Sequence, residues 1–140
     1  MHPPESIVSP IVSIEHSDAH GAVPTSTNGL QVLAVEDNAL NLMILRQQLT
    51  KLGCHTSTAS NGQEALDQLG RSSFDIVLMD CLMPVMDGFE ATRIWRRVES
   101  DGLRERTPIL AVTALVMQSD IDLCLASGMD EVLSKPLHLT

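Results

Sequence analysis

Residues 76–88 read IVLMDCLMPVMDG, an apolar run that stops at the acid Asp80 and continues as a loop through Pro84. The run is apolar on both faces, which is typical of a central strand in a parallel sheet. Asp87 and Gly88 then predict a turn into a helix, with Asp87 as the cap and Gly88 permitting a positive φ. Asp80 is therefore either part of a plain strand-to-helix turn or a reactive carboxylate at the carboxyl-terminal edge of a sheet.

Strand and helix patterns alternate on both sides of this stretch. Apolar runs predict strands at residues 30–35, 75–79 and 108–112, and two further short strands are expected at residues 55–59 and 132–134. Apolar residues at helical spacing predict four helices. The first ends at Gly53, and the second spans residues 63–69 and ends at Gly70. The third runs from Gly88 to about Glu99, and the fourth ends at Gly128. The inward residues of the helix after Gly88 are expected to be Ala91, Ile94, Trp95 and Val98.

This alternation predicts an α/β fold, in the form of a doubly wound, five-stranded parallel sheet. Its crossovers should be right-handed, with helices on both faces of the sheet. We assign residues 29–140 to this domain. Residues 1–28 are rich in Pro, Ser, Thr and His, and we interpret them as a poorly structured linker or leader.

Five polar side chains fall where the predicted strands end, which is where such sheets form their sites. They are Glu36, Asp37, Asp80, Thr113 and Lys135. Carboxylates brought together repel one another unless a cation lies among them. All-oxygen ligation suits Mg²⁺, with Mn²⁺ as an alternative. A carboxylate can also attack phosphorus to form an aspartyl phosphate, and the ammonium and hydroxyl groups suit phosphoryl oxygens.

Four motifs in this order resemble the receiver domain of two-component response regulators. They are VEDN (35–38), LMDCLMPVMDG (78–88), VTAL (112–115) and SKP (134–136). The resemblance implies a flavodoxin-like fold and a role for each strand-end residue. By this resemblance, Asp80 would be the phosphoacceptor. Asp37 would bind the metal directly, Glu36 partly through water, and Leu82 through its backbone carbonyl. Thr113 and Lys135 would contact the phosphoryl group.

The sequences EDNxxN, LxxLG and MDxxMPxMDG are similar to those of receivers in hybrid sensor histidine kinases. That similarity implies a phosphorelay, in which the domain takes a phosphoryl group from a histidine and passes it to a histidine phosphotransfer domain or switches a partner interaction. The expected partners are thus a histidine kinase, a histidine phosphotransfer domain or both, and a dimer is left open. We expect no independent enzyme in this chain, although it could be a fragment of a histidine kinase.

Three positions depart from the family pattern. Val132 stands where receivers usually carry an aromatic switch residue. Leu82 and Leu115 occupy two positions that tune the phosphate lifetime, and two apolar groups there predict slow autodephosphorylation. The chain also stops at Thr140, so the final helix of the fold is expected to be missing.

Composition excludes several other classes of function. The chain has 140 residues and a formal net charge of −9, which argues against binding to nucleic acid or to anionic membranes. No apolar run is long enough to span a membrane. The three cysteines have no disulfide or zinc spacing, so we expect a cytoplasmic location, which leaves open a membrane-anchored parent protein. We interpret Cys81 as a small apolar space-filler rather than a redox handle.

Two alternatives are weighed against the receiver. An aspartyl phosphatase of the haloacid-dehalogenase type needs a second Asp two residues after the nucleophile, where this chain has Leu82. The lack of this second acid argues strongly against that class. A receiver-like interaction module that is never phosphorylated remains the alternative function.

Overall fold

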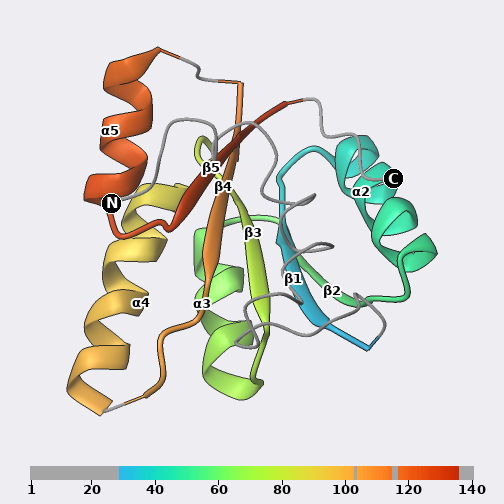
Figure 1. Cartoon of the computed structure of the whole chain (residues 1–140), viewed down its shortest axis with the longest axis horizontal. Coiled ribbons are helices and arrows are strands. Elements are labelled where there is room, and N and C mark those ends of the chain that lie inside the picture. Colours follow the sequence, from blue (N-terminus) through green and yellow to red (C-terminus); the bar gives the residue numbers. More distant parts are fainter. Residues whose placement is uncertain (1–28, 103, 115–116, 136–140) are drawn as a thin grey trace, which may run out of the picture.

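The computed structural model describes residues 29–102, 104–114 and 117–135. A five-stranded parallel sheet lies at its centre, in the order β2-β1-β3-β4-β5 (Figure 1). The strands are β1 (Gln31–Val35), β2 (His55–Ala59), β3 (Ile76–Asp80), β4 (Ile109–Thr113) and β5 (Glu131–Ser134). This order is the flavodoxin-like form of a doubly wound sheet, so the predicted fold class is confirmed.

Four helices connect the strands and cover both faces of the sheet. They are α2 (Ala39–Lys51), α3 (Gly62–Arg71), α4 (Gly88–Gly102) and α5 (Gln118–Ala126). In Figure 1, α2 lies on one side of the sheet, while α4 and α5 lie together on the other. This distribution on both faces agrees with the prediction.

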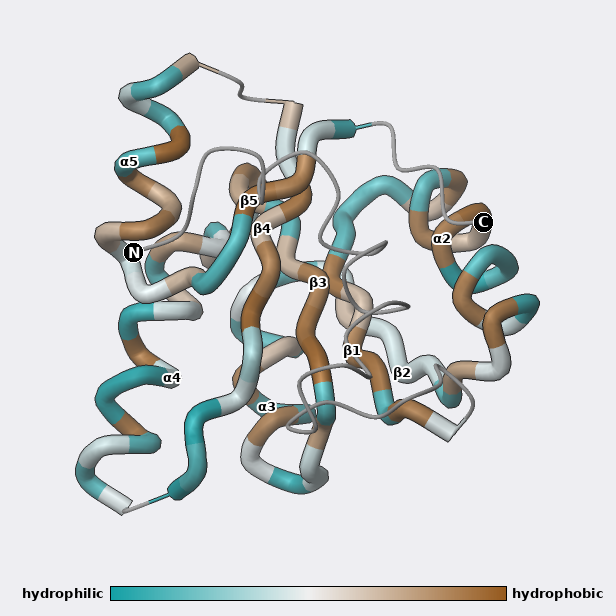
Figure 2. The backbone as a smooth tube through the Cα atoms, viewed as in Figure 1, coloured by the Kyte–Doolittle hydropathy of each residue, from teal (hydrophilic) through white to brown (hydrophobic). Residues whose placement is uncertain are grey.

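Two hydrophobic clusters, one on each face, form the core. Successive residues of a strand point to opposite faces, so Leu33 and Val77 enter one cluster while Ala34 and Leu78 enter the other. The first cluster contains side chains from α3, α4 and α5, and the second contains side chains from α2. In Figure 2 the central strands are the most continuously hydrophobic part of the backbone. Burial on both faces explains why β1, β3 and β4 read as near-continuous apolar runs, whereas the edge strand β2 is polar and only partly buried.

The helix after Gly88 differs from the prediction in length and in its buried face. It continues past the predicted end near Glu99 to Gly102. Val98, predicted to point inward, is 38% exposed, whereas Glu99 is 5% exposed. The buried carboxylate is tolerated because Arg96 Nη1 donates to it at 2.8 Å and the Thr107 N–H donates at 2.6 Å.

The first helix after β2 is also longer than predicted. Gly70 was expected to end it, but α3 continues through Gly70 to Arg71. A Cβ at Gly70 would meet nothing within 4 Å, so this glycine is neither a cap nor a point of close packing.

Some predictions fall outside the described residues. The linker or leader at residues 1–28, the lifetime position Leu115 and the end of the chain at residues 136–140 all belong to this group. Among the described residues, no helix is both long and apolar enough to cross a bilayer.

Candidate functional site

Parallel strands bring the five predicted side chains to one edge of the sheet. Glu36 and Asp37 follow β1, Asp80 ends β3, Thr113 ends β4 and Lys135 follows β5. All five line a cavity of about 300 Å³. The acidic cluster and its basic and hydroxyl neighbours therefore meet as the sequence predicts.

Lys135 connects two buried carboxylates across the edge of the sheet. Its Nζ lies 2.9 Å from Glu36 Oε1 and 3.2 Å from Asp80 Oδ2. Its backbone N–H donates to the carbonyl of Thr113 at 2.9 Å, which fixes the start of its side chain. Burial alone would lower the pKa of Lys135, but the two carboxylates raise it above its usual value. Lys135 is thus a fixed positive charge in the site.

Glu36 is held by backbone as well as by Lys135. Its Oε2 accepts the N–H of Asn38 at 3.0 Å, and Asn38 in turn caps α2 by accepting the N–H of Asn41 at 2.9 Å. Burial tends to raise the pKa of Glu36, but the bonds from Lys135 and Asn38 lower it below its usual value. Because Asn38 is the cap, the carboxylate of Asp37 is not used to start the helix and stays exposed.

Asp80 is the buried carboxyl whose ionisation is most disfavoured. Burial raises its pKa to about 6, and repulsion by Glu36 adds to this effect. Attraction to Lys135 opposes the rise without cancelling it. A single ammonium group therefore does not balance the negative charge gathered at this edge of the sheet.

Three carboxylates could hold a metal ion together. Glu36, Asp37 and Asp80 each offer an oxygen, and these oxygens lie within 4.8 Å of one another. The all-oxygen donor set and the surplus of negative charge fit a hard divalent cation. Leu82 lines the same cavity with its side chain 56% exposed. Metal ligation by its carbonyl stays a prediction.

The loop after Asp80 is held close to the strand by glycine. A Cβ at Gly88 would collide with the backbone oxygen of Asp80 and lie 2.8 Å from the Met79 side chain. The predicted positive φ at Gly88 is wrong, since Gly88 is not among the positive-φ glycines of the described residues. Close approach of α4 to the end of β3 is the physical reason for this glycine. Asp87 does cap α4 as predicted, since its Oδ1 accepts the N–H of Glu90 at 2.8 Å.

A strained turn lies in the same loop. Val85 has a φ of +73°, and the N–H of Met86 donates to the carbonyl of Pro84 at 2.9 Å. This is a γ-turn with a positive φ at its central residue, which is rare and strained for a branched side chain. The Met86 carbonyl then accepts the N–H of Gly62 at 2.8 Å, which ties the loop to the start of α3.

The position of the expected aromatic switch is part of the core. Val132 is 2% exposed and packs in the cluster shared with α4 and α5. Sequence reasoning missed one contact near the site: the sulfurs of Cys81 and Cys124 lie 3.5 Å apart. Nothing in the local pattern pairs residues so far apart along the chain.

Comparisons with known proteins agree with the resemblance in sequence. The family model of the response regulator receiver domain matches residues 32–140. Hybrid signal transduction histidine kinase G of Dictyostelium discoideum is 44% identical over 117 residues, covering 82% of this chain and 3% of that protein. Sensor histidine kinase RcsC of Escherichia coli (strain K12) is 36% identical over 135 residues, covering 92% of this chain and 14% of that protein. The chain therefore spans only a small part of the length of these curated relatives.

Solved structures show the same fold. One is the receiver domain of sensor histidine kinase PA1611 from Pseudomonas aeruginosa PAO1, with a magnesium ion coordinated in the active site cleft. It is 36% identical with a TM-score of 0.68, covering 79% of this chain and 88% of that chain. Another is the co-crystal of the Saccharomyces cerevisiae histidine phosphotransfer protein Ypd1 with the receiver domain of its downstream response regulator Ssk1. The match there is 34% identical with a TM-score of 0.73, covering 80% of this chain and 82% of that chain.

The family match extends over more than two thirds of the sequence and includes every strand-end residue of the site. The strand order and the relatives in hybrid kinases agree with it. This chain belongs to the response regulator receiver domain family, whose role in two-component signalling is that of a phosphoacceptor.

Proposed function

We propose that Asp80 accepts a phosphoryl group from a phosphohistidine in a Mg²⁺-dependent reaction and relays it or switches a partner interaction. The observation that carries this proposal is the position of Lys135, whose ammonium lies between Glu36 and Asp80 in the site cavity. A buried acid beside a fixed cation and an open cavity suits a nucleophile that must meet a phosphoryl donor.

The transfer balances without any further reactant. An oxygen of ionised Asp80 attacks phosphorus, the bond from phosphorus to the histidine nitrogen breaks, and the electron pair of that bond stays on the imidazole, which keeps or takes up a proton. Lys135 and Thr113 line the cavity, and we infer that the ammonium and the hydroxyl contact the phosphoryl oxygens once these enter it. Lys135 would then exchange part of its contact with Asp80 for the phosphoryl group.

Magnesium fits the carboxylates of this site. Asp37 is the exposed member of the three and offers an oxygen toward solvent, while Glu36 and Asp80 offer buried ones. When bound, the ion would neutralise charge on the transferring phosphoryl group. We limit the proposal to Mg²⁺ because the donors are all oxygen and the similar PA1611 receiver holds that ion in its cleft.

A histidine-bearing partner would need a surface next to the cavity. The first turns of α2 expose three apolar side chains, Leu40 at 60%, Met43 at 51% and Ile44 at 43%. Asn41 on the same turns lines the site cavity. An apolar patch beside a polar cavity is typical of a protein docking site. We propose that a histidine phosphotransfer domain docks here, a partner class present in the similar Ypd1–Ssk1 co-crystal.

Acetyl phosphate with Mg²⁺, followed by intact mass measurement, tests the proposal. We expect a gain of one phosphoryl group that disappears when EDTA is added beforehand or when Asp80→Asn is used. Asp101→Asn, an exposed acid at the end of α4, is the matched control and should be phosphorylated like the wild type. A phosphoryl group that persists in Asp80→Asn contradicts the assignment, and no gain in any protein favours the unphosphorylated interaction module.

A second experiment tests the docking patch. A histidine phosphotransfer domain labelled on its histidine should pass its phosphoryl group to the wild type and, much more slowly, to Met43→Glu. Acetyl phosphate should phosphorylate both proteins at similar rates, because the cavity itself is unchanged. Equal transfer from the protein donor would exclude this patch.

A further inference from the structure

Two buried cysteines meet beside the phosphoacceptor position. Cys81 directly follows Asp80 after β3, and Cys124 lies in α5. Their sulfurs are 3.5 Å apart, and both residues have no exposed surface. Cys54 belongs to the core cluster on the other face of the sheet. The pair therefore joins two elements around the site, and the third cysteine is a natural control.

Either of the two buried sulfurs can donate the hydrogen bond that joins them. Contact with Cys81 lowers the pKa of the Cys124 thiol. We therefore assign the first reaction with an oxidant to Cys124.

We propose that Cys81 and Cys124 are a reversible redox pair that hydrogen peroxide converts to a disulfide, and that this bond slows phosphorylation of Asp80. The second part rests on the function proposed above. The sulfurs already touch in the reduced protein, so only a modest approach separates them from bonding distance. Cys81 does pack as a small side chain in the hydrophobic core, and the proposal adds a redox role to that packing.

The chemistry balances in two steps. The Cys124 sulfur attacks one oxygen of peroxide, the O–O bond breaks, and water leaves to give a sulfenic acid on Cys124. The Cys81 sulfur then attacks the Cys124 sulfur, the S–O bond breaks, and the hydroxyl leaves as water with the Cys81 proton. Two thiols lose two electrons in total, and one peroxide is reduced to two waters.

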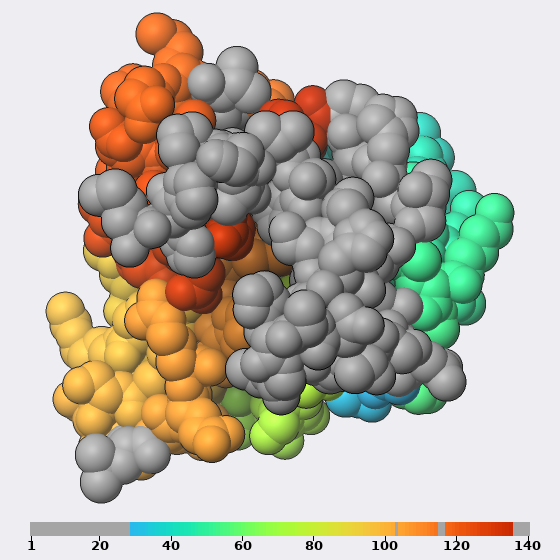
Figure 3. All heavy atoms as spheres, in the orientation of Figure 1, coloured from blue at the N-terminus to red at the C-terminus, as the bar shows by residue number. Residues whose placement is uncertain are grey.

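Access to the pair depends on local opening of α5. This helix has nine residues, and its N-cap position, Met117, forms no side-chain cap bond. Figure 3 shows α5 at the outer margin of the molecule. A short, peripheral helix with an uncapped start opens at lower free energy than the whole domain. Oxidation should therefore be slower than for an exposed thiol and yet occur in the folded protein.

The disulfide would act on the site through Thr113. The Thr113 hydroxyl interacts with the Cys81 thiol, and α5 is the next described element after β4, which ends at Thr113. Oxidation removes the thiol proton and ties α5 to the residue after Asp80. Thr113 then has less freedom to reach an incoming phosphoryl group, so phosphorylation slows.

The first test maps the bond in the native protein, so no variant has to fold. After exposure to hydrogen peroxide, the protein is alkylated in denaturant without reductant, and its peptides are identified by mass. We expect a linked Cys81–Cys124 peptide, a loss of about 2 Da from the intact chain, an alkylated Cys54, and full reversal by dithiothreitol. Cys54→Ala should keep the disulfide, whereas Cys124→Ala should lose it.

The second test compares the oxidised and reduced proteins with acetyl phosphate and Mg²⁺. We expect several-fold slower phosphorylation after oxidation in the wild type and in Cys54→Ala, and no change in Cys124→Ala. Three free thiols after peroxide treatment, or a disulfide that includes Cys54, would overturn the redox pair. Equal rates for the oxidised and reduced proteins would overturn its effect on the site.

The two proposals can fail separately. A disulfide in a protein whose reduced form takes no phosphoryl group contradicts the proposed function and leaves the redox pair standing. A protein that is fully phosphorylated but keeps all three thiols after peroxide treatment contradicts the redox pair and leaves the proposed function standing.

Discussion

At the residue scale, Lys135 couples the chemistry of the site to its stability. Its ammonium contacts Glu36 and Asp80, whose side chains are each 6% exposed, while its own side chain is 25% exposed. A buried carboxylate without such a partner would be strongly destabilised in its ionised form. The lysine thus offsets part of the repulsion between the two acids. Asp37 is left facing solvent, where an ion can reach it.

Removal of that exposed carboxylate should weaken metal binding without unfolding the protein. In the wild type, Mg²⁺ at ten times its Kd should raise the free energy of unfolding by about 1.4 kcal/mol, because it binds only the folded state. Asp37→Asn should lose most of this gain and keep the metal-free stability. Urea unfolding with Mg²⁺ or with EDTA measures both quantities. Asp101→Asn is the control. If Mg²⁺ stabilises Asp37→Asn as much as the wild type, Asp37 is not a metal ligand.

Leu82 offers nothing that could orient a water molecule at the phosphoryl group. Its side chain is 56% exposed at the rim of the cavity. Leu82→Asn should shorten the half-life of the phosphorylated protein several-fold, because an amide can position the attacking water. The decay of the phosphorylated mass after removal of acetyl phosphate measures this. Leu123→Asn, 47% exposed on α5, should decay like the wild type. An unchanged half-life in Leu82→Asn would contradict the prediction.

At the scale of elements, the packing of α4 against the end of β3 sets the position of Asp80. Gly88→Ala should destabilise the fold by about 2 kcal/mol, because its Cβ would overlap the Asp80 backbone. Phosphorylation should fall as well, since the backbone of Asp80 must move. Gly102→Ala at the other end of the same helix is the control, because its Cβ would meet only the Arg104 side chain at 3.7 Å. Chemical denaturation and the acetyl phosphate assay give both readouts, and equal behaviour of the two variants would refute this account.

The elements were largely predictable, and their ends less so. Apolar runs buried on both faces located β1, β3 and β4 to within about a residue, because such runs have few other uses in a domain of this size. The bounds of β2 and β5 were predicted equally closely, although β2 is a polar edge strand that is only partly buried. The buried face of α4 was predicted one residue off at its end. Val98 was expected inside, but Glu99 is there because Arg96 and the Thr107 N–H satisfy its carboxylate. One donor lies on the same helix and the other, the Thr107 N–H, lies after it. Hydrophobic periodicity does not indicate such polar partners.

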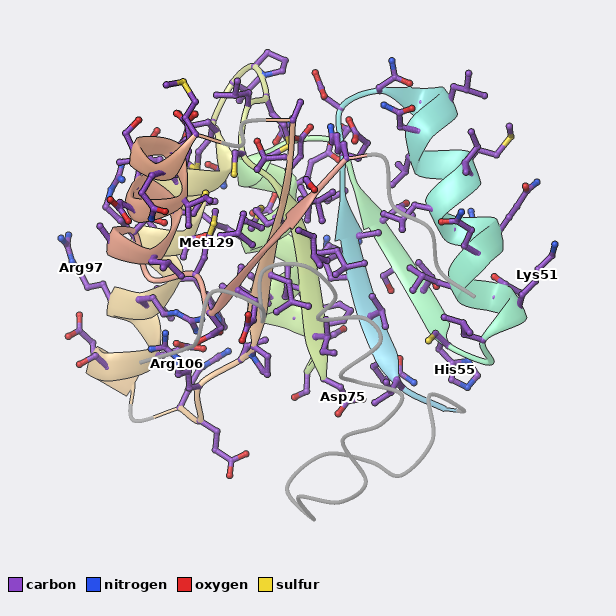
Figure 4. The ribbon with its side chains drawn as sticks, turned by 45° about the horizontal axis from the view of Figure 1, so that its top comes forward. Lys51, His55, Asp75, Arg97, Arg106 and Met129 are labelled. Carbon is purple, nitrogen blue, oxygen red and sulfur yellow. The ribbon has the colours of Figure 1, made fainter. Side chains whose placement is uncertain are left out.

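At the scale of the whole molecule, Arg96 joins α4 to two later segments. Its side chain donates to the carbonyls of Gly128 at 2.9 Å and Thr107 at 2.7 Å and pairs with Asp130 at 2.8 Å. The Arg96 side chain is only 12% exposed. In contrast, Arg97 points away from the fold in Figure 4.

These two neighbours provide a matched test. Arg96→Lys keeps the charge but cannot reproduce the forked set of donors, so the free energy of unfolding should fall by about 2 kcal/mol. Arg97→Lys should change it by less than about 0.5 kcal/mol, as is usual for an exposed position. Urea unfolding of both variants measures the difference. Equal stability of the two would show that the Arg96 bonds contribute little.

The candidate site was more predictable than this network. A parallel sheet places the ends of its strands at one edge, so the order of motifs alone brought Asp37, Asp80 and Lys135 together. The Arg96 bonds and the Cys81–Cys124 contact depend on how helices pack on the sheet. The packing angles of the helices and the directions of their side chains cannot be predicted from the order of residues in the sequence.

The packing of Trp95 gives the protein an optical reporter of its own. It is the sole tryptophan, the chain has no tyrosine, and the ring is 5% exposed beneath the Arg104 guanidinium, 5.2 Å from the ring centroid. Near-ultraviolet excitation will therefore yield emission from one buried indole. That indole lies near Phe74 and Thr107, where β3 and β4 begin, whereas Asp80 lies where β3 finishes. Its fluorescence should therefore change on unfolding, but it should change little when a metal ion or a phosphoryl group binds at the acidic edge of the sheet.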